Sequence, residues 1–382
     1  MTLLDGLTVV DFSRVLAGPS ATQMLADLGA RVIKIERPEH GDDTRAWGPP
    51  WTGDSSSYYF ATNRSKESVE LDLASAEDRA IAIDLVRSAD ILVENFITGT
   101  MARFGLDFES LSRMNERLIY CSVTGFGGYG GATLPGYDFI VQAVGGLMSI
   151  TGEPDGKPMK TGVAIVDILT GKDAVIGILA ALAERSRSGL GQRVEVNLLS
   201  SLLGSLANQA GSYLSTGVAP IRMGNQHPSI APYETLHCGD GIIAVACGND
   251  RQFSQFVAVL GAEHLAADVR FATNAQRVAH RAELIVDLEA QLAHHSTAHW
   301  VERFTSAGVP AATVGDIASA IAYAAELGLE PTIEVLPGMP RQIRHPVTYS
   351  RSALRPASPP PALGNHNELV KSRLRYGAGE PE

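Results

Sequence analysis

Asp167 is the residue whose type and position fit a role in catalysis. It follows the apolar run GVAIV, which predicts a strand, and it precedes the longer pattern ILTGKDAVIGILAALAERS, which predicts a helix. An aspartate at such a junction is typical of a helix N-cap, because its carboxylate accepts backbone N–H groups. The carboxyl end of a strand is also where open α/β sheets bind ligands, and a carboxylate there can act beside amides that stabilise an oxyanion. The sequence leaves both roles open for Asp167, and they are compatible.

Two other patterns look like functional sites but lack essential parts. Residues 125–130 have the GxGxxG spacing after an expected strand, yet they continue into Pro135 instead of opening a helix, which argues against a nicotinamide cofactor. His294, His295 and His299 lie close together without a neighbouring acid, so we expect a solvated helix face and no metal site.

The elements that must position Asp167 alternate between strands and helices in the N-terminal half. Apolar runs that predict strands are LTVVDFS (7–13), RVIKIER (31–37), SVELDL (68–73), ILVENF (91–96) and LIYCSVTGF (118–126). Between these runs, apolar residues recur at the spacing of a helix. The alternation of strands and helices indicates a mostly parallel sheet covered by helices. From about residue 224 the pattern changes, and YETLHCGDGIIAVAC predicts an antiparallel hairpin. We therefore expect a Rossmann-like α/β domain over 1–200, a linker helix over 201–223, a smaller α+β domain over 224–325 and a return to the large domain over 326–382.

Composition restricts the classes of partner. The 382 residues carry a formal net charge of −11, which disfavours nucleic-acid binding, and an anionic ligand would need local basic contacts. The three cysteines form no CxxC pair, which is typical of buried thiols in a reducing compartment. No leader pattern precedes the first strand, and the longest apolar run is shorter than the roughly 20 residues of a membrane span. We expect a cytoplasmic protein that binds no membrane.

Ordered motifs along almost the whole chain carry a family resemblance. These are DFSRVLAGP, VIKIERP, SVELDL, VENF, GFG, GYDFIVQAVGGLMSITG, GVAIVDILTG, RSGLGQRVEVNLL and LGNHNELV, between about residues 4 and 366. The chain resembles the class III coenzyme A transferases, which include formyl-CoA and carnitine CoA transferases and also α-methylacyl-CoA racemases. The resemblance implies an interlaced homodimer in which each chain passes through a ring made by its partner.

The resemblance also implies a chemistry. Asp167 would attack an acyl-CoA thioester to form a mixed anhydride, the released thiolate would convert it to an aspartyl-CoA thioester, and an acceptor carboxylate would reverse the cycle. Tyr137 stands where many transferases place a tyrosine near the thioester; otherwise it is a packed aromatic with a bonded hydroxyl. No metal or prosthetic group is implied, because coenzyme A is a substrate. Contacts to coenzyme A carried over from the matching motifs are Val15, Leu16, Arg37, Leu71, Asn95, Phe96 and Arg103.

Two other functions stay open at this point. Racemases of the family carry histidine where this chain has Tyr137, and a tyrosine with an ordinary pKa is a poor base at neutral pH. The nearest acid to the expected second base is Asp250, in GNDRQF. A catalytically silent coenzyme A-binding paralogue is the third reading.

The glycine-rich flap of formyl-CoA transferases is absent, since this chain reads MGNQHPSIAPYETL there. That departure disfavours formate and oxalate, and HPSIAPYETL could supply a more rigid lid. The donor and acceptor acids are not readable from the sequence. Family habit favours a succinyl-CoA donor with a dicarboxylate or aromatic acceptor.

Overall fold

The computed structural model describes residues 2–376, which divide into two compact units. Unit 1 comprises Met1–Leu147, Thr161–Thr216 and Leu329–Glu382, and unit 2 comprises Met148–Lys160 and Gly217–Gly328. The segment 148–160, which we expected within the large domain, therefore groups with the smaller unit. In the described residues, no helix combines the length and apolar character needed to cross a bilayer.

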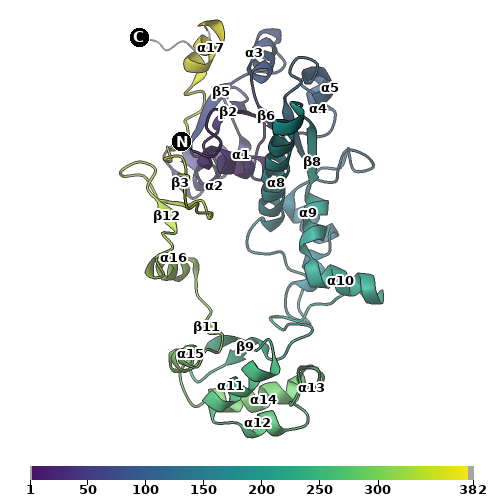
Figure 1. The fold of residues 1–382 in the computed structure, drawn as a ribbon, viewed down its shortest axis with the longest axis vertical. Coiled ribbons are helices and arrows are strands. Elements are labelled where there is room, and N and C mark those ends of the chain that lie inside the picture. Colours follow the sequence, from purple (N-terminus) through teal and green to yellow (C-terminus); the bar gives the residue numbers. More distant parts are fainter. Residues whose placement is uncertain (1, 377–382) are drawn as a thin grey trace. The chain divides into compact units, whose positions relative to one another are not determined.

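Unit 1 is built on a six-stranded sheet in the order β5-β2-β1-β6-β7-β8 (Figure 1). The strands are β1 (Thr8–Asp11), β2 (Arg31–Glu36), β5 (Lys66–Glu70), β6 (Ile91–Glu94), β7 (Ile119–Thr124) and β8 (Arg193–Asn197). Every neighbouring pair is parallel. The α/β fold with a parallel sheet is therefore confirmed, and its strand order is that of a doubly wound nucleotide-binding fold, with the reversal between β1 and β6.

Helices cover both faces of this sheet, because successive strand residues point to opposite sides. Val9 packs against one set of helices and its neighbour Val10 against the other. The first set is α1 (Ala17–Asp27), α8 (Ile165–Ser188) and α9 (Leu198–Ser205); the second is α3 (Ala76–Arg87), α4 (Thr100–Arg103), α5 (Phe108–Leu111) and α17 (Asn367–Tyr376). Strands buried on both faces explain the continuous apolar runs of the sequence.

The C-terminal segment completes unit 1 at the sheet edge. The backbone N–H of His366 donates to the carbonyl of Ser68 (3.0 Å), and the N–H of Glu70 donates to the Asn367 side chain (2.8 Å). Edge strand β5 is thereby covered, which removes unpaired backbone groups from that side. The remaining elements of the region up to α10 and of the C-terminal part are η1 (Asp43–Ala46), β3 (Trp51–Thr52), β4 (Ser55–Ser56), α2 (Ser57–Thr62), α6 (Asp138–Val144), α7 (Leu147–Ile150), α10 (Ala207–Thr216), β12 (Thr332–Ile333) and β13 (Gln342–Ile343).

Two expectations about the middle of the chain are wrong. GVAIV is not a strand, since α8 already begins at Ile165 and runs without interruption to Ser188. A short apolar run fits a buried strand and a buried helix equally well, so periodicity could not separate them. The linker helix expected over 201–223 is not one helix: the region contains the end of α9 and then α10, which meet at Ala207, whose φ of 42° is incompatible with a continuous helix.

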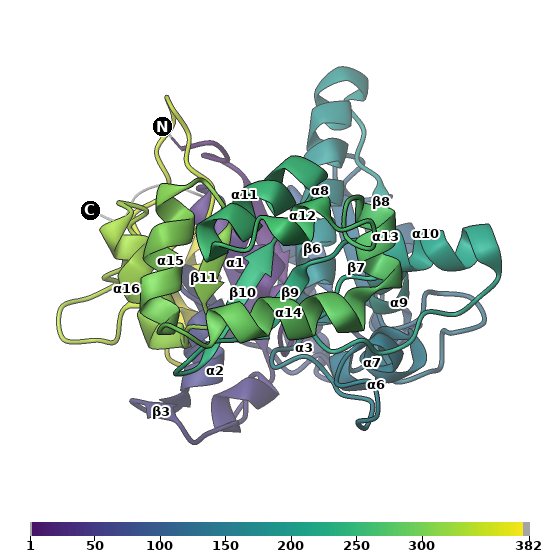
Figure 2. The same ribbon diagram turned by 90° about the horizontal axis from the view of Figure 1, so that it is seen from below.

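Unit 2 is an antiparallel three-stranded sheet, β11-β10-β9, packed against helices (Figure 2). Its strands are β9 (Tyr233–His237), β10 (Ile242–Ala246) and β11 (Ala311–Thr313), and the predicted hairpin is confirmed by the pairing of β9 with β10. Its helices are α11 (Asp250–Leu260), α12 (His264–Ala267), α13 (Asn274–Ala279), α14 (Arg281–Leu292), α15 (Thr297–Ser306) and α16 (Ile317–Glu326). A separate apolar core, which includes Phe253, Phe256 and Trp300, supports this unit.

Two buried arginines of unit 2 bind the backbone of the HPSIA segment (227–231). Arg281 Nη2 donates to the carbonyls of His227 (2.6 Å) and Ile230 (2.9 Å), and Arg277 Nε donates to that of Ala231 (2.7 Å). Both arginines are buried, so these carbonyls are satisfied by fixed charged donors. The segment that replaces the glycine run is therefore anchored backbone.

Candidate active site

The site is built where the sheet reverses its winding order. Strands β1 and β6 are neighbours, and the chain leaves their carboxyl ends in opposite directions, which opens a crevice at this edge. Residues 13–16 follow β1 and residues 95–98 follow β6. The backbone of Arg14 is bound at both ends by Asn95, whose Oδ1 accepts from the Arg14 N–H (2.9 Å) and whose Nδ2 donates to the Arg14 carbonyl (2.7 Å). The two loops therefore form one fixed surface.

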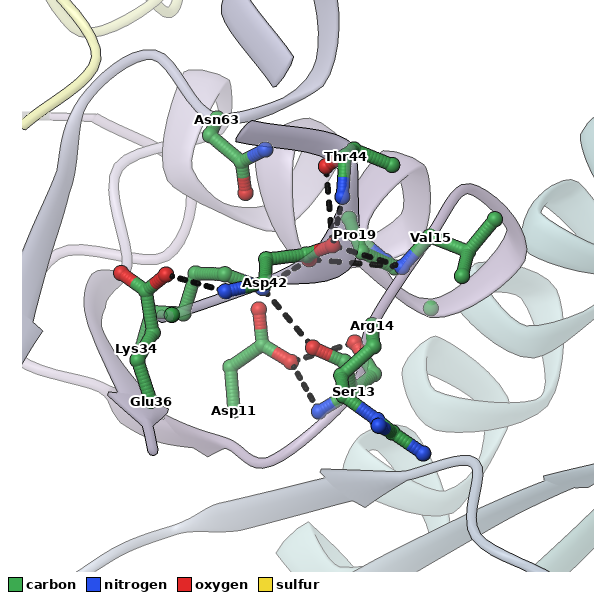
Figure 3. A network of polar contacts seen from close by, with 12 residues as sticks. Asp11, Ser13, Arg14, Val15, Pro19, Lys34, Glu36, Asp42, Thr44 and Asn63 are labelled. Atoms are coloured by element: carbon green, nitrogen blue, oxygen red, sulfur yellow. Dashed lines mark hydrogen bonds and ion pairs between the residues drawn. The ribbon is translucent and has the colours of Figure 1, made fainter. Parts of the chain in front are cut away.

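Val15 holds the loop after β1 in an unusual conformation. Its φ of 70° lies in the left-handed region, which a β-branched residue rarely adopts and which costs about 1–3 kcal/mol. The Val15 N–H is directed at the carboxylate of Asp42, with both oxygens at 3.3 Å (Figure 3). The surrounding contacts thus impose a backbone shape that the sequence of the loop disfavours.

A buried charge network lies behind this loop (Figure 3). Lys34 Nζ pairs with Asp42 (2.9 Å) and donates to the Ser13 carbonyl (2.8 Å), and Lys66 pairs with Asp11 (3.2 Å). All four side chains are inaccessible to solvent. Burial raises the pKa of the Asp42 carboxyl, but the Lys34 ammonium and the hydrogen bonds from Thr44 together outweigh burial and hold that pKa below its usual range. Asp42 is therefore ionised and can hold both Val15 and Lys34.

Asp167 is the third residue of α8 and does not cap it. The helix is capped from another element: Asp138 Oδ2 accepts the backbone N–H of Val166 (2.7 Å) and of Asp167 (3.3 Å). Asp138 Oδ1 in turn accepts from Gln142 Nε2 (2.6 Å). The expected N-cap role of Asp167 is thus wrong. These two amides are also occupied, so they are not free to stabilise an oxyanion beside Asp167.

The Asp167 carboxyl has a strongly altered acidity. Burial, followed by the nearby negative charge of Asp138, raises its pKa to about 7. Within residues 2–376 its side chain has no hydrogen-bond or ion-pair partner, while its N–H is held by Asp138. A carboxyl that is poorly solvated and unpaired is a more basic nucleophile when ionised. Such a group in a cleft is a candidate for function.

Close backbone contact brings Tyr137 to the same cleft. A Cβ added at Gly125 would lie 2.4 Å from the Cα of Gly136, and one added at Gly136 would lie 2.2 Å from the Cα of Gly125. Gly125 follows β7 and Gly136 precedes Tyr137, so the two glycines allow the backbone of these two segments to cross in close contact. The GxGxxG segment, which begins at Gly125, therefore has a structural role at this crossing. Tyr137 is 58% exposed, which excludes the packed aromatic role.

Two neighbouring cavities contain most of the predicted residues. The Asp167 cavity, of about 290 Å³, is lined by residues that include Val15, Leu16, Asn95, Phe96, Tyr137 and Asp167. The Leu71 cavity, of about 250 Å³, is lined by residues that include Lys34, Arg37, Asp42, Leu71, Phe96 and Phe104. Arg14 and Phe96 line both cavities, so the two are adjacent. Arg103 is exposed and lines neither, but its guanidinium lies 6.0 Å from the ring centre of Phe104.

Sequence reasoning missed two side chains of the site. Arg14 lies between the cavities with its guanidinium 5.1 Å from the ring centre of Phe96, and only the neighbouring residues 15 and 16 were predicted. Tyr58 is held near Asp167: burial, then the charges of Asp167 and Asp138, raise the pKa of Tyr58 to about 12. Arg14 could have been found as the cation of the first loop, whereas nothing local in SSSYYFAT marks Tyr58.

Comparison with known proteins places this site in a family. The profile of CoA-transferase family III matches residues 4–367. The chain is 45% identical to a succinate–glutarate CoA-transferase of Agrobacterium fabrum, over 97% of this chain and 95% of that protein. The chain belongs to CoA-transferase family III. Among further family III relatives, a mouse succinyl-CoA:glutarate CoA-transferase is 38% identical over 100% of this chain and 89% of that protein.

The solved structures agree with this family III assignment. The crystal structure of a CAIB/BAIF family protein from Brucella suis superposes with a TM-score of 0.87 at 44% identity, covering 98% of this chain and 99% of that chain. An acetyl-CoA:oxalate CoA-transferase of Acetobacter aceti is 44% identical over 83% of this chain and 82% of that protein. The protein is therefore a CoA-transferase of family III, and acyl-CoA thioesters are among its substrates.

Proposed function

We propose that this protein transfers coenzyme A from an acyl-CoA to a free carboxylic acid, with Asp167 as the covalent nucleophile. The observation that carries the proposal is the Asp167 carboxyl itself. It lines the cavity at the sheet's switch point, lacks a side-chain partner among residues 2–376 and has a pKa raised to about 7. Covalent catalysis by Asp167 would lower the barrier to acyl exchange, because it divides one difficult step into easier ones.

The proposed cycle has four balanced steps. The Asp167 carboxylate attacks the thioester carbonyl, forming a mixed anhydride and expelling the CoA thiolate. That thiolate attacks the aspartyl carbonyl of the anhydride, forming an aspartyl-CoA thioester and releasing the donor carboxylate. The acceptor carboxylate attacks this thioester to give a new anhydride and thiolate. The thiolate then attacks the acyl carbonyl of the anhydride, which forms the product acyl-CoA and regenerates Asp167.

Asp138 acts in this proposal as a positioning residue. It fixes the first turn of α8 through the amides of Val166 and Asp167, and its charge adds to the raised pKa of Asp167. Because these amides are taken, another donor must stabilise the oxyanion. Tyr137 and Tyr58 are two of the hydroxyl-bearing side chains that the structure brings to this region, and Thr98 and Thr124 also line the Asp167 cavity.

Coenzyme A is proposed to span the two cavities. The nucleotide end would lie in the Leu71 cavity beside Arg37, with Arg103 outside it near Phe104, and the pantetheine arm would pass Asn95 and Phe96 toward Asp167. Guanidinium groups suit phosphates because their planar donors bind two oxygens at once. No metal or prosthetic group has a role in this scheme.

The substrates are proposed to be short dicarboxylic acids and their CoA thioesters. Three relatives that align over most of the chain are named for succinate or succinyl-CoA with glutarate. The HPSIA segment (227–231) stands in the sequence where formyl-CoA transferases carry a glycine run, and we propose that it stays fixed where theirs moves. Oxalate should be tested beside the dicarboxylic acids, because one relative is named for oxalate.

The proton-transfer alternative has little support in the structure. Asp250, the acid nearest to the expected second base, is bound by the fully buried Arg277 through Nη2 (2.7 Å). The Asp250 carboxylate is therefore already paired with a cation in the folded protein. Racemisation would need two free bases on opposite faces of one carbon.

The test is mass spectrometry of the intact protein mixed with succinyl-CoA, glutaryl-CoA and acetyl-CoA, with hydroxylamine as a trap. We expect an acyl or CoA adduct that maps to Asp167 and that is absent from Asp167→Ala. An adduct elsewhere would overturn the nucleophile assignment. If no adduct formed but the α-proton of the substrate exchanged with deuterium, the protein would be a racemase and not a transferase. If neither an adduct nor exchange were observed, the protein would be a catalytically silent CoA-binding protein.

A further inference from the structure

Asp43 bridges two arginines at the mouth of the site. Its Oδ2 pairs with Arg14 Nη1 (3.3 Å), and its Oδ1 makes a short contact with Arg37 Nη2. Arg14 comes from the loop after β1 and Arg37 follows β2, so one carboxylate joins cations from two elements. The side chains of Arg14, Arg37 and Asp43 are 39%, 50% and 36% exposed, which leaves this cluster accessible to a solute.

The cluster lies at the boundary of the two cavities. Asp43 and Arg14 line the Asp167 cavity, and Arg14 and Arg37 line the Leu71 cavity. The side chain of Arg14 points away from the buried network, while its backbone belongs to the loop that this network supports (Figure 3). A ligand that extends from one cavity to the other must therefore pass the bridged arginines.

The two guanidinium groups are not fully used by Asp43. Arg37 Nε donates to the Gly41 carbonyl (3.1 Å), whereas Arg14 Nε is buried and has no partner among the described residues. Each guanidinium has five N–H donors, and one carboxylate neutralises only one of the two positive charges. A local positive charge thus remains in a protein whose net charge is −11. Carboxylate and phosphate bind guanidinium with the same paired geometry.

We propose that Asp43 is an internal counter-ion that occupies the place of the nucleotide phosphates of coenzyme A and is displaced when they bind. This inference rests on the proposed function and adds a residue that limits affinity. In the free protein Asp43 holds Arg14 and Arg37 together and keeps other anions away. On binding, the phosphates take over both guanidinium groups, and the Asp43 carboxylate turns to solvent. Asp43 therefore weakens the binding of coenzyme A, which helps the product to leave.

The proposed displacement of Asp43 should affect the affinity for coenzyme A and the dependence of that affinity on salt concentration. Without the Asp43 charge, the two arginines are neutralised by solution anions, which binding must release, so affinity should fall more steeply as salt rises. With Asp43 present, fewer solution anions are released. We expect Asp43→Asn to bind coenzyme A about threefold to tenfold more tightly at low salt, the range typical of exposed and partly buried ion pairs.

The experiment is isothermal titration calorimetry of free coenzyme A into the full-length protein at several salt concentrations. Wild type, Asp43→Asn and Glu39→Gln are compared, because Glu39 is an exposed acid of the same loop with no ion pair among the described side chains. Asp43→Asn should fold normally, since Asp42 and not Asp43 caps η1. Tighter binding with a steeper salt slope in Asp43→Asn, and little change in Glu39→Gln, is the expected result.

Unchanged or weaker binding by Asp43→Asn would overturn the inference, because it would make Asp43 a mere support for the arginines. An equal gain in Glu39→Gln would overturn it too, by showing a general charge effect. In an Arg14→Ala/Arg37→Ala background, Asp43→Asn should have no effect on affinity. If wild type itself fails to bind coenzyme A, the proposed function fails rather than this refinement of it.

Discussion

At the scale of single residues, the acidity of Asp167 links structure to rate. The nucleophile must be ionised, and burial together with Asp138 raises its pKa to about 7. We therefore predict that kcat/KM for an acyl-CoA rises about tenfold per pH unit below that pKa and is level above it. Initial rates between pH 5.5 and 8.5 test this, with a dephospho-CoA thioester as the control because the 3′-phosphate of coenzyme A itself titrates at about pH 6. A profile that is flat from pH 5.5 upward would mean that Asp167 is already ionised there.

The same pKa predicts that Asp167 lowers the stability of the fold. The folded protein keeps this proton up to about pH 7, whereas the carboxyl ordinarily loses it near 3.8. The free energy of unfolding therefore decreases as pH rises between these values, because the unfolded chain binds fewer protons there. Asp167→Asn should remove this penalty and raise Tm by roughly 2–5 °C above pH 7, with a smaller gain at pH 5.

Calorimetry of the two proteins at both pH values is the measurement. Asp173→Asn offers a control on the same helix, since Asp173 accepts a hydrogen bond from Ser201 (2.6 Å) and has an ordinary structural role. A loss of stability in Asp167→Asn at pH 8 would show that the carboxylate has a favourable partner in the folded protein.

At the scale of elements, the crossing of two chain segments decides where Tyr137 lies. A methyl group on Gly136 would be 2.2 Å from the Cα of Gly125, a contact with backbone that cannot be relieved by a side-chain rotation. Gly136→Ala should therefore lower the free energy of unfolding by about 1–3 kcal/mol and reduce turnover. Gly130→Ala lies in the same loop with no atom within 4 Å of the new methyl group, so its stability and rate should stay close to wild type.

Chemical denaturation and steady-state rates of these two variants give the answer. If Gly136→Ala were as stable and active as Gly130→Ala, the backbone contact would not position the site. The comparison separates a close approach from the general flexibility of a glycine-rich loop.

At the scale of the whole molecule, apolar helix faces predict assembly. Neither α10 nor α16 contains a buried residue, although both helices carry large apolar side chains. Leu214 of α10 and Ile317 of α16 are each 82% exposed. Exposed apolar faces of this kind mark interaction sites. We propose, as the family resemblance implies, that a second copy of the chain covers them in an interlaced homodimer.

The predicted outcome is that dilution yields no folded monomer. Light scattering over a wide range of concentrations should give the mass of two chains throughout. Leu214→Lys should impair assembly, whereas a charge at the exposed Val269 in unit 2 should not. A stable, folded monomer peak of the wild-type chain would contradict the interlaced arrangement.

Five of the six strands of the sheet were predictable from the sequence alone. Five mostly apolar runs correspond to β1, β2, β5, β6 and β7, because strands buried on both faces are rich in apolar residues. The family resemblance pointed to Val15, Asn95 and Phe96, which lie after β1 and β6 and line the Asp167 cavity. Asp167 lines the same cavity but belongs to α8, so it does not follow a strand as the sequence pattern predicted.

The surroundings of Asp167 could not be predicted from the sequence. The residue is inside a helix that Asp138 caps from 29 positions away in sequence, and Tyr58 approaches from another element. The pairing of Asp43 with Arg14, 29 residues apart, is equally invisible in a single sequence. Acidity and ion pairing depend on distances between segments, whereas strand and helix patterns depend on neighbours along the chain.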